Sequence, residues 1–209
     1  VFDIGFRYDK GQVQINEFYD LLLYQHLIQR GRSEEDAQFF ATRSRSVQRN
    51  FSQGSFQFQA VFDPNEKWLG SVNLGSVFRF PTAIELAANG IHHGSFRHEV
   101  GDASLNPERG WQLEFDFQSK FKKATFQLTP YAYFFENYIF LRPSMEFSPL
   151  PHGGQIFVFS QSRALLAGIE FSTFVNVTPR LQTYLSAEYI FNQQLNAQNK
   201  GGFSLPFSP

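Results

Sequence analysis

Apolar and polar residues alternate with a period of two along much of the chain. In the clearest segment, Trp111 to Gln118, every second residue is apolar and the residues between them are Gln, Glu and Asp. The same alternation recurs in residues 56–59, 125–134, 165–172 and 181–191. Because residues two apart share one side of a strand, this pattern predicts amphipathic antiparallel strands.

The segments between these strands differ in length in a regular way. Short polar turns are expected at residues 63–67, 119–123 and 177–180. Long connections are expected from Asp9 to about Asn50, from Pro81 to Glu108, and from Arg142 to about Gln155. Short turns that alternate with long loops are typical of bacterial outer-membrane barrels. The fold class predicted is therefore all-β, a segment of an antiparallel transmembrane β-barrel, with the apolar face toward lipid and the polar face toward the lumen.

Aromatic residues mark several of the expected strand ends. In a barrel they would form the girdles at the two membrane interfaces. The residues concerned are Trp68, Phe78, Phe80, Trp111, Tyr138 and Phe140.

The first long connection is expected to contain one or two short helices. Residues 16–30 carry apolar side chains near helical spacing, and residues 33–36 resemble a capping box ahead of Ala37 and Phe39. These helices would pack in the loop layer without crossing the membrane.

A water-soluble β-sandwich or small barrel that binds a hydrophobic ligand or a carbohydrate is the alternative fold and function. Half-buried strands in such a protein also alternate. Detergent dependence would separate the two interpretations.

Composition narrows the class of protein. The 209 residues include 27 Phe, no Cys and a formal net charge of -1. The absence of Cys excludes disulfides and thiolate chemistry. The near-neutral charge disfavours a nucleic-acid surface, and no run of about 18 apolar residues is present for a membrane helix. A chain of this kind can span a membrane only as a barrel.

A series of motifs resembles the barrel of TonB-dependent receptors. An Arg-x-Pro at residues 79–81 is followed by Gly90-Ile91-His92-His93-Gly94 and by Leu105-Asn106-Pro107-Glu108. Further family-like segments follow the family's order at residues 1–9, 135–139, 167–171 and 201–206. Each motif is weak alone, but their order along nearly the whole chain is specific.

The resemblance implies a nutrient importer and no enzymatic activity. Residues 1–209 would be about seven to eight strands of a barrel that has about 22 strands in this family, without the plug domain and the final strands. We expect localisation in the bacterial outer membrane. The expected partners are the TonB complex, reached through the plug, outer-membrane lipid and lipopolysaccharide, and a small-molecule metal chelate. No cofactor is expected beyond a transported haem or metal chelate, and the expected nutrient is an iron chelate, haem or another metal complex.

Four residues between the Arg-x-Pro and Leu-x-Pro-Glu motifs are candidate ligand contacts in an extracellular loop. They are His92, His93, His98 and Glu99. Imidazole binds zinc, copper, iron and nickel, and carboxylates complete such sites. The resemblance to haem and zinc receptors makes His92 and His93 candidate metal ligands. The other interpretation is that these side chains order the loop through hydrogen bonds.

A second group of polar residues is expected to face the lumen, where it would contact the plug or water. It consists of Arg79, Glu114, Asp116, Glu170 and Glu188. A catalytic carboxylate pair is disfavoured, because a raised carboxyl pKa needs burial and a wet lumen offers little. Arg43, Arg45 and Arg49 form a small basic cluster that would touch an anionic ligand or lipopolysaccharide, or be solvated.

Overall fold

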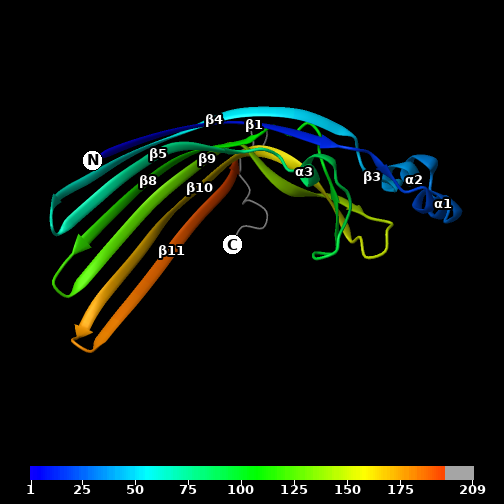
Figure 1. The fold of residues 1–209 in the computed structure, drawn as a ribbon. Helices are drawn as coiled ribbons and strands as arrows, with labels where there is room; N and C mark the ends of the chain where they lie inside the picture. The colour runs from blue at the N-terminus through cyan, green and yellow to red at the C-terminus, as the bar shows by residue number, and fades with distance from the viewer. Residues whose placement is uncertain (196–209) are drawn as a thin grey trace.

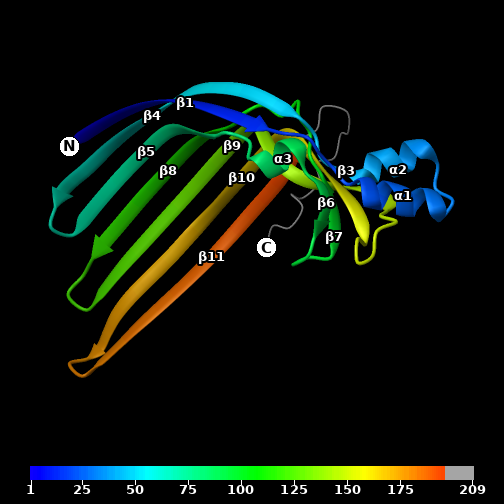
Figure 2. The same ribbon diagram turned by 45° about the vertical axis from the view of Figure 1, so that its right-hand side comes forward.

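The computed structural model describes residues 1–195, and seven long strands dominate this range. They form one curved antiparallel sheet (Figures 1 and 2). In sheet order the long strands are β1 (Phe2–Ile15), β4 (Val47–Asn65), β5 (Trp68–Arg79), β8 (Glu108–Lys120), β9 (Ala124–Phe147), β10 (Gln155–Thr178) and β11 (Leu181–Leu195). The predicted strands are therefore confirmed, while the beginning of an eighth strand and the motif at residues 201–206 lie outside the described residues.

The sheet exposes its apolar side chains more than its polar ones. On β8, Leu113, Phe115 and Phe117 are 37%, 47% and 46% exposed, whereas Glu114 and Asp116 between them are partly buried. A sheet that packs against its own core shows the reverse order. The face that carries Leu113, Phe115 and Phe117 is called the apolar face below, and the face that carries Glu114 and Asp116 the polar face. The lower exposure of the polar face places it on the concave side of the curved sheet.

Turns and long connections lie at opposite ends of the strands (Figures 1 and 2). The three tight turns, at residues 66–67, 121–123 and 179–180, close the hairpins β4–β5, β8–β9 and β10–β11. Near the turn ends of β5 and β8, Trp68 packs against Phe117 and Phe121, with ring centroids 5.1 and 6.3 Å apart. This aromatic group is of the kind expected at a membrane interface.

The first connection contains the two helices that the sequence predicts. They are α1 (Leu21–Gln29) and α2 (Glu34–Ala41), flanked by the short paired strands β2 (Phe18–Tyr19) and β3 (Thr42–Ser44). The Ser33 side chain caps α2 by accepting a 3.1 Å hydrogen bond from the Asp36 backbone N–H. The complete capping box lies elsewhere, at Thr82 and Glu85 of the next connection.

The second connection folds back onto the sheet. It contains α3 (Ala83–Ala87) and a hairpin of β6 (Asn89–His92) and β7 (Arg97–Val100). Strand β7 pairs in parallel with the start of β10, from Ile156 to Val158. This brings two loops that are far apart in sequence side by side.

Two predicted loop boundaries are wrong. Strand β1 continues to Ile15 and β4 begins at Val47, so the first connection is shorter than residues 9–50. Likewise β9 runs to Phe147, and its connection to β10 is only residues 148–154. Polarity still alternates in these parts of β1 and β9, as in Gln12-Val13-Gln14-Ile15 and Ser144-Met145-Glu146-Phe147, so both strands extend beyond the predicted bounds by the same period-two rule.

The loop layer has its own apolar core. One buried cluster joins Leu27, Ala37 and Phe40 of the first connection to Val100, Leu150 and Ile156. A second joins β4 and α3 to β9 through Val47, Phe51, Leu86, Ala87, Leu105 and Ile139. Phe140, predicted for an interfacial girdle, is only 8% exposed and does not form part of an exposed aromatic belt.

Candidate binding surface on the polar face and in the loops

Carboxylates on the polar face accept hydrogen bonds from neighbouring strands. Glu114 accepts a 2.5 Å bond from the Tyr133 hydroxyl. Asp116 accepts bonds from the Gln127 amide at 3.0 Å and from the Thr129 hydroxyl at 3.2 Å. These contacts link β8 to β9 and hold the two carboxylates in place.

Tyr131 extends across one strand to reach another. Its hydroxyl donates a 3.0 Å hydrogen bond to Glu188 on β11, while β10 lies between at Gly168. A Cβ atom at Gly168 would lie 2.5 Å from the Tyr131 ring and hydroxyl, so only glycine leaves room for this crossing. The Tyr131 and Tyr133 rings also stack, with centroids 5.3 Å apart.

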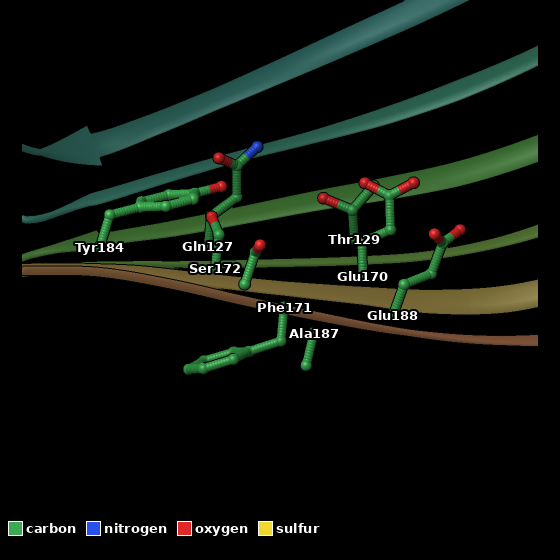
Figure 3. Close-up of a pocket in the computed structure, with 9 residues that line it drawn as sticks. Gln127, Thr129, Glu170, Phe171, Ser172, Tyr184, Ala187 and Glu188 are labelled. Atoms are coloured by element: carbon green, nitrogen blue, oxygen red, sulfur yellow. The ribbon is translucent and has the colours of Figure 1, made fainter.

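A shallow hollow of about 430 Å³ lies on the polar face where β9, β10 and β11 run together. Figure 3 shows Gln127, Thr129, Glu170 and Glu188 on one side of the sheet, while Phe171 points to the other side. Glu170 and Glu188 are direct partners across the β10–β11 ladder. Two like charges in register disfavour pairing unless a donor or cation offsets them, and the Tyr131 hydroxyl supplies one donor.

Arg79 joins the two ends of the second connection. Its guanidinium forms ion pairs with Glu85 of α3 at 2.8 Å and with Glu108 of β8 at 3.2 Å. Glu108 also accepts a 2.9 Å bond from the Ile139 backbone N–H. The family-like Arg-x-Pro and Leu-x-Pro-Glu motifs therefore meet in one cluster at the base of the loop.

The two candidate metal ligands lie at the tip of the β6–β7 hairpin. His92 and His93 are both exposed. The His92 Nδ1 atom is 3.0 Å from the Ser95 hydroxyl, and His93 follows in the turn. Within residues 1–195, no three His, Asp or Glu side chains are grouped closely enough to hold a metal ion. Metal binding by His92 and His93 stays a prediction.

His98 occupies a different environment from the other two histidines. It is fully buried, and both ring nitrogens have partners, Asn89 Oδ1 at 2.7 Å and the Ser148 hydroxyl at 2.9 Å. Burial, together with the positive charge of Arg43, lowers the pKa of His98 to about 4. The ring is therefore neutral at neutral pH, and neither nitrogen is free to bind a ligand in this arrangement.

Glu99 also lies inside the loop layer. It is 6% exposed and forms a 2.7 Å ion pair with Arg97 on the same strand. In this arrangement the carboxylate of Glu99 is paired inside the protein, whereas His92 and His93 meet solvent.

The predicted basic cluster is divided among several contacts. Arg49 donates to the backbone carbonyls of Ala103 and Leu105 and stacks over Phe51. Arg45 lies over the Phe39 ring, with 5.7 Å from its guanidinium carbon to the ring centroid. The Arg49 contacts therefore join strand β4 to the second connection, while the Arg45 contact lies within the first connection.

Several residues of the site are not evident from the sequence. Asn89, Ser148 and Gly168 are common residue types whose roles depend on neighbours that are distant in sequence. The capping box at Thr82 and Glu85 had a detectable Thr-x-x-Glu signal.

Comparison with known proteins identifies the family. Residues 1–209 match the model of the TonB dependent receptor-like beta-barrel, so the chain belongs to the TonB-dependent receptors. The sequence has no significant match among curated proteins. Within residues 1–195, no helix is long and apolar enough to cross a membrane.

Solved structures of this family share the fold. The copper transporter OprC aligns over 91% of this chain and 26% of its own, with 16% identity and a TM-score of 0.64. The siderophore receptor PirA from Pseudomonas aeruginosa aligns over 71% of this chain and 31% of its own, with 16% identity and a TM-score of 0.55. The Serratia marcescens hemophore receptor HasR, solved with its hemophore HasA and heme, aligns over 93% of this chain and 31% of its own, with 16% identity and a TM-score of 0.53.

The chain spans about a quarter to a third of the length of these receptors. At this identity the likeness concerns the fold. The match of residues 1–209 to the receptor beta-barrel model favours the barrel segment over the alternative of a soluble β-sandwich or small barrel.

Proposed function

We propose that this chain forms part of the wall and ligand-facing loops of an outer-membrane receptor that imports a scarce nutrient with energy supplied through TonB. The observation that carries this proposal is the inverted exposure of the sheet. Phe115 and Phe117 face outward on the convex side, while hydrogen-bonded Glu114 and Asp116 face inward. Lipid is the solvent that accepts the first surface, and a hydrated interior accepts the second.

The complete receptor would contain a plug domain inside the barrel and further strands to close it. The polar face, with Glu114, Asp116, Glu170 and Glu188, would then contact the plug or line the path of the ligand. Arg79 would fix the base of the second loop instead of contacting the ligand, because two carboxylates already bind its guanidinium.

A metal chelate or haem is the proposed ligand class. The structural relatives include receptors described as binding or transporting copper, siderophores and haem carried by a hemophore. In this chain the exposed imidazoles of His92 and His93 are the groups that could contact such a ligand, because His98 and Glu99 are buried and paired.

Growth of a deletion strain tests the receptor function. The strain is supplied with ferric chelates, haem, zinc or copper as the limiting source. We expect growth to fall on one source and to recover with the gene, but only in cells that have TonB. Unchanged growth on every source would contradict an uptake function of this metal-nutrient class.

Titration of the purified receptor tests the histidines. Haemin and zinc are titrated into the wild type and into a His92→Ala/His93→Ala double variant. His26→Ala is the matched control, because His26 is an exposed imidazole on α1. Weaker binding in the double variant alone supports direct contact, and equal binding in all three proteins excludes it.

A further inference from the structure

His98 is the meeting point of all three long connections. Its strand, β7, belongs to the second connection, and Asn89 of β6 lies beside it. Ser148 belongs to the third connection. Asn89 then donates from its amide nitrogen to the carbonyls of Phe39 at 2.6 Å and Thr42 at 2.9 Å, which belong to the first connection.

The hydrogen-bond directions in this group are determined by its chemistry. Both amide hydrogens of Asn89 are used on carbonyls, so its Oδ1 atom must accept, and His98 Nε2 must carry the hydrogen. The Ser148 hydroxyl accepts from the Leu150 backbone N–H at 3.2 Å. It is then free to donate its own hydrogen to His98 Nδ1. A neutral imidazole satisfies every one of these partners.

The surroundings favour this arrangement over others. The Phe40 ring of α2 packs edge-on against the imidazole, with centroids 5.4 Å apart. A Cβ atom at Gly153 would lie 2.5 Å from the Ser148 side chain, so glycine is needed to leave room for that hydroxyl. Buried polar groups of this kind are costly when unpaired and specify one arrangement when all are paired.

We propose that His98 is a positioning residue that fastens the three ligand-facing loops into a single body through Asn89 and Ser148. The inference rests on the proposed function, because loops matter for ligand capture only if they face the medium. Preordering lowers the entropic cost of binding, since the loops are not ordered again when the ligand arrives.

Protonation of His98 would disturb the joined loops at its contact with Ser148. A proton on Nδ1 turns an acceptor into a donor that points at Ser148, whose hydrogen then loses its acceptor. Arg43 of β3 adds a positive charge nearby, and the Arg97–Glu99 pair on β7 itself is already internally matched. The loops should therefore loosen together in acid.

Hydrogen exchange in the complete receptor, without ligand, tests the proposal. His98→Leu removes both hydrogen bonds at similar volume, while His98→Gln retains one donor and one acceptor. His92→Ala is the control on the neighbouring strand. In His98→Leu, we expect protection to fall about tenfold or more both in residues 38–44 and in residues 148–154, because each lost bond contributes roughly 0.5–1.5 kcal/mol. Protection in His98→Gln should stay within about threefold of the wild type on the same reasoning.

Loss of protection confined to residues 89–100, or equal loss in His98→Gln and His98→Leu, would overturn the proposal. If His98→Leu does not fold, the wild type is compared between pH 7 and pH 3.5, with His98→Gln as the non-titrating reference. If the wild type loses protection at pH 3.5 both in residues 38–44 and in residues 148–154, the role proposed for His98 is supported. Loss of protection in one of these segments, or in neither, refutes it. Because this experiment uses no ligand, failure of the role proposed for His98 can be distinguished from failure of the proposed uptake function.

Discussion

Replacement of Arg79 by Met should release the base of the second connection. Arg79 is bound by Glu85 at 2.8 Å and by Glu108 at 3.2 Å, and the two carboxylate side chains are only 12% and 14% exposed. An unpaired buried charge costs about 3–5 kcal/mol. Here each carboxylate retains a backbone donor, Thr82 at 2.7 Å for Glu85 and Ile139 at 2.9 Å for Glu108. Since the Arg79 side chain is also 41% exposed, we expect a smaller loss, about 2–3 kcal/mol.

Hydrogen exchange of α3 and of the Ile139 amide measures this loss directly. A change of about 2–3 kcal/mol corresponds to roughly a 30- to 150-fold fall in protection. Burial acts to raise the pKa of Glu85, but the hydrogen bonds with Arg79 and Thr82 outweigh burial, so the pKa lies below its ordinary value. Because Arg79→Met removes one of these hydrogen bonds, it should raise the pKa of Glu85. Arg180→Met is the control, because Arg180 lies in the tight turn before β11. If protection in Arg79→Met falls by less than about threefold, or if protection in Arg180→Met falls by the same amount as in Arg79→Met, the reasoning is refuted.

Three further changes test other parts of the structure. Gly168→Ala should destabilise the refolded receptor by about 1–3 kcal/mol in urea, because a Cβ there meets Tyr131 at 2.5 Å; Gly70→Ala, whose Cβ has its nearest neighbour at 3.8 Å, should be nearly neutral. Phe115→Arg on the apolar face should cost about 2–4 kcal/mol for folding into lipid vesicles, and an effect near zero would mean that this face does not meet the bilayer core. The pKa of His98 falls to about 4 in the folded protein from 6.5, so the unfolded chain binds the extra proton first. Stability should fall by up to about 3 kcal/mol as the pH drops from about 6.5 to about 4, with no further His98 contribution below that, and a flat unfolding profile that matches His98→Gln would contradict this.

The sheet could be predicted from the sequence because its rule is local. Side chains alternate with a period of two, so the assignment of Leu113 and Glu114 to opposite faces needed only their order. The turn at residues 63–67 was marked by Asp, Pro and Asn, and the strands on either side of it do pair. The helix cap at Ser33 was equally local.

The loop layer could not be predicted in the same way because its contacts are distant in sequence. The parallel pairing of β7 with β10 joins His98 to Ile156. The alternation of side chains in β7 and β10 does not predict that these two strands pair. His98 illustrates the consequence, since a nitrogen lone pair that binds a metal is the same one that accepts a hydrogen bond. The sequence left both uses open, and only the positions of Asn89 and Ser148 favour the second.

Apolar side chains are exposed in the wall and buried in the loop layer, so the two regions are stabilised in different ways. In the wall, Phe115 and Phe117 are exposed and gain nothing from contact with water, whereas in the proposed receptor lipid would supply the favourable transfer of their rings. In the loop layer, Leu86, Leu105 and His98 are at most 1% exposed, as in a water-soluble core. A change of detergent or lipid should therefore alter the stability of the strands far more than the hydrogen-exchange protection of the loops. In the proposed receptor, the loops would keep one arrangement while the wall adapts to its membrane, because different solvents stabilise the two regions.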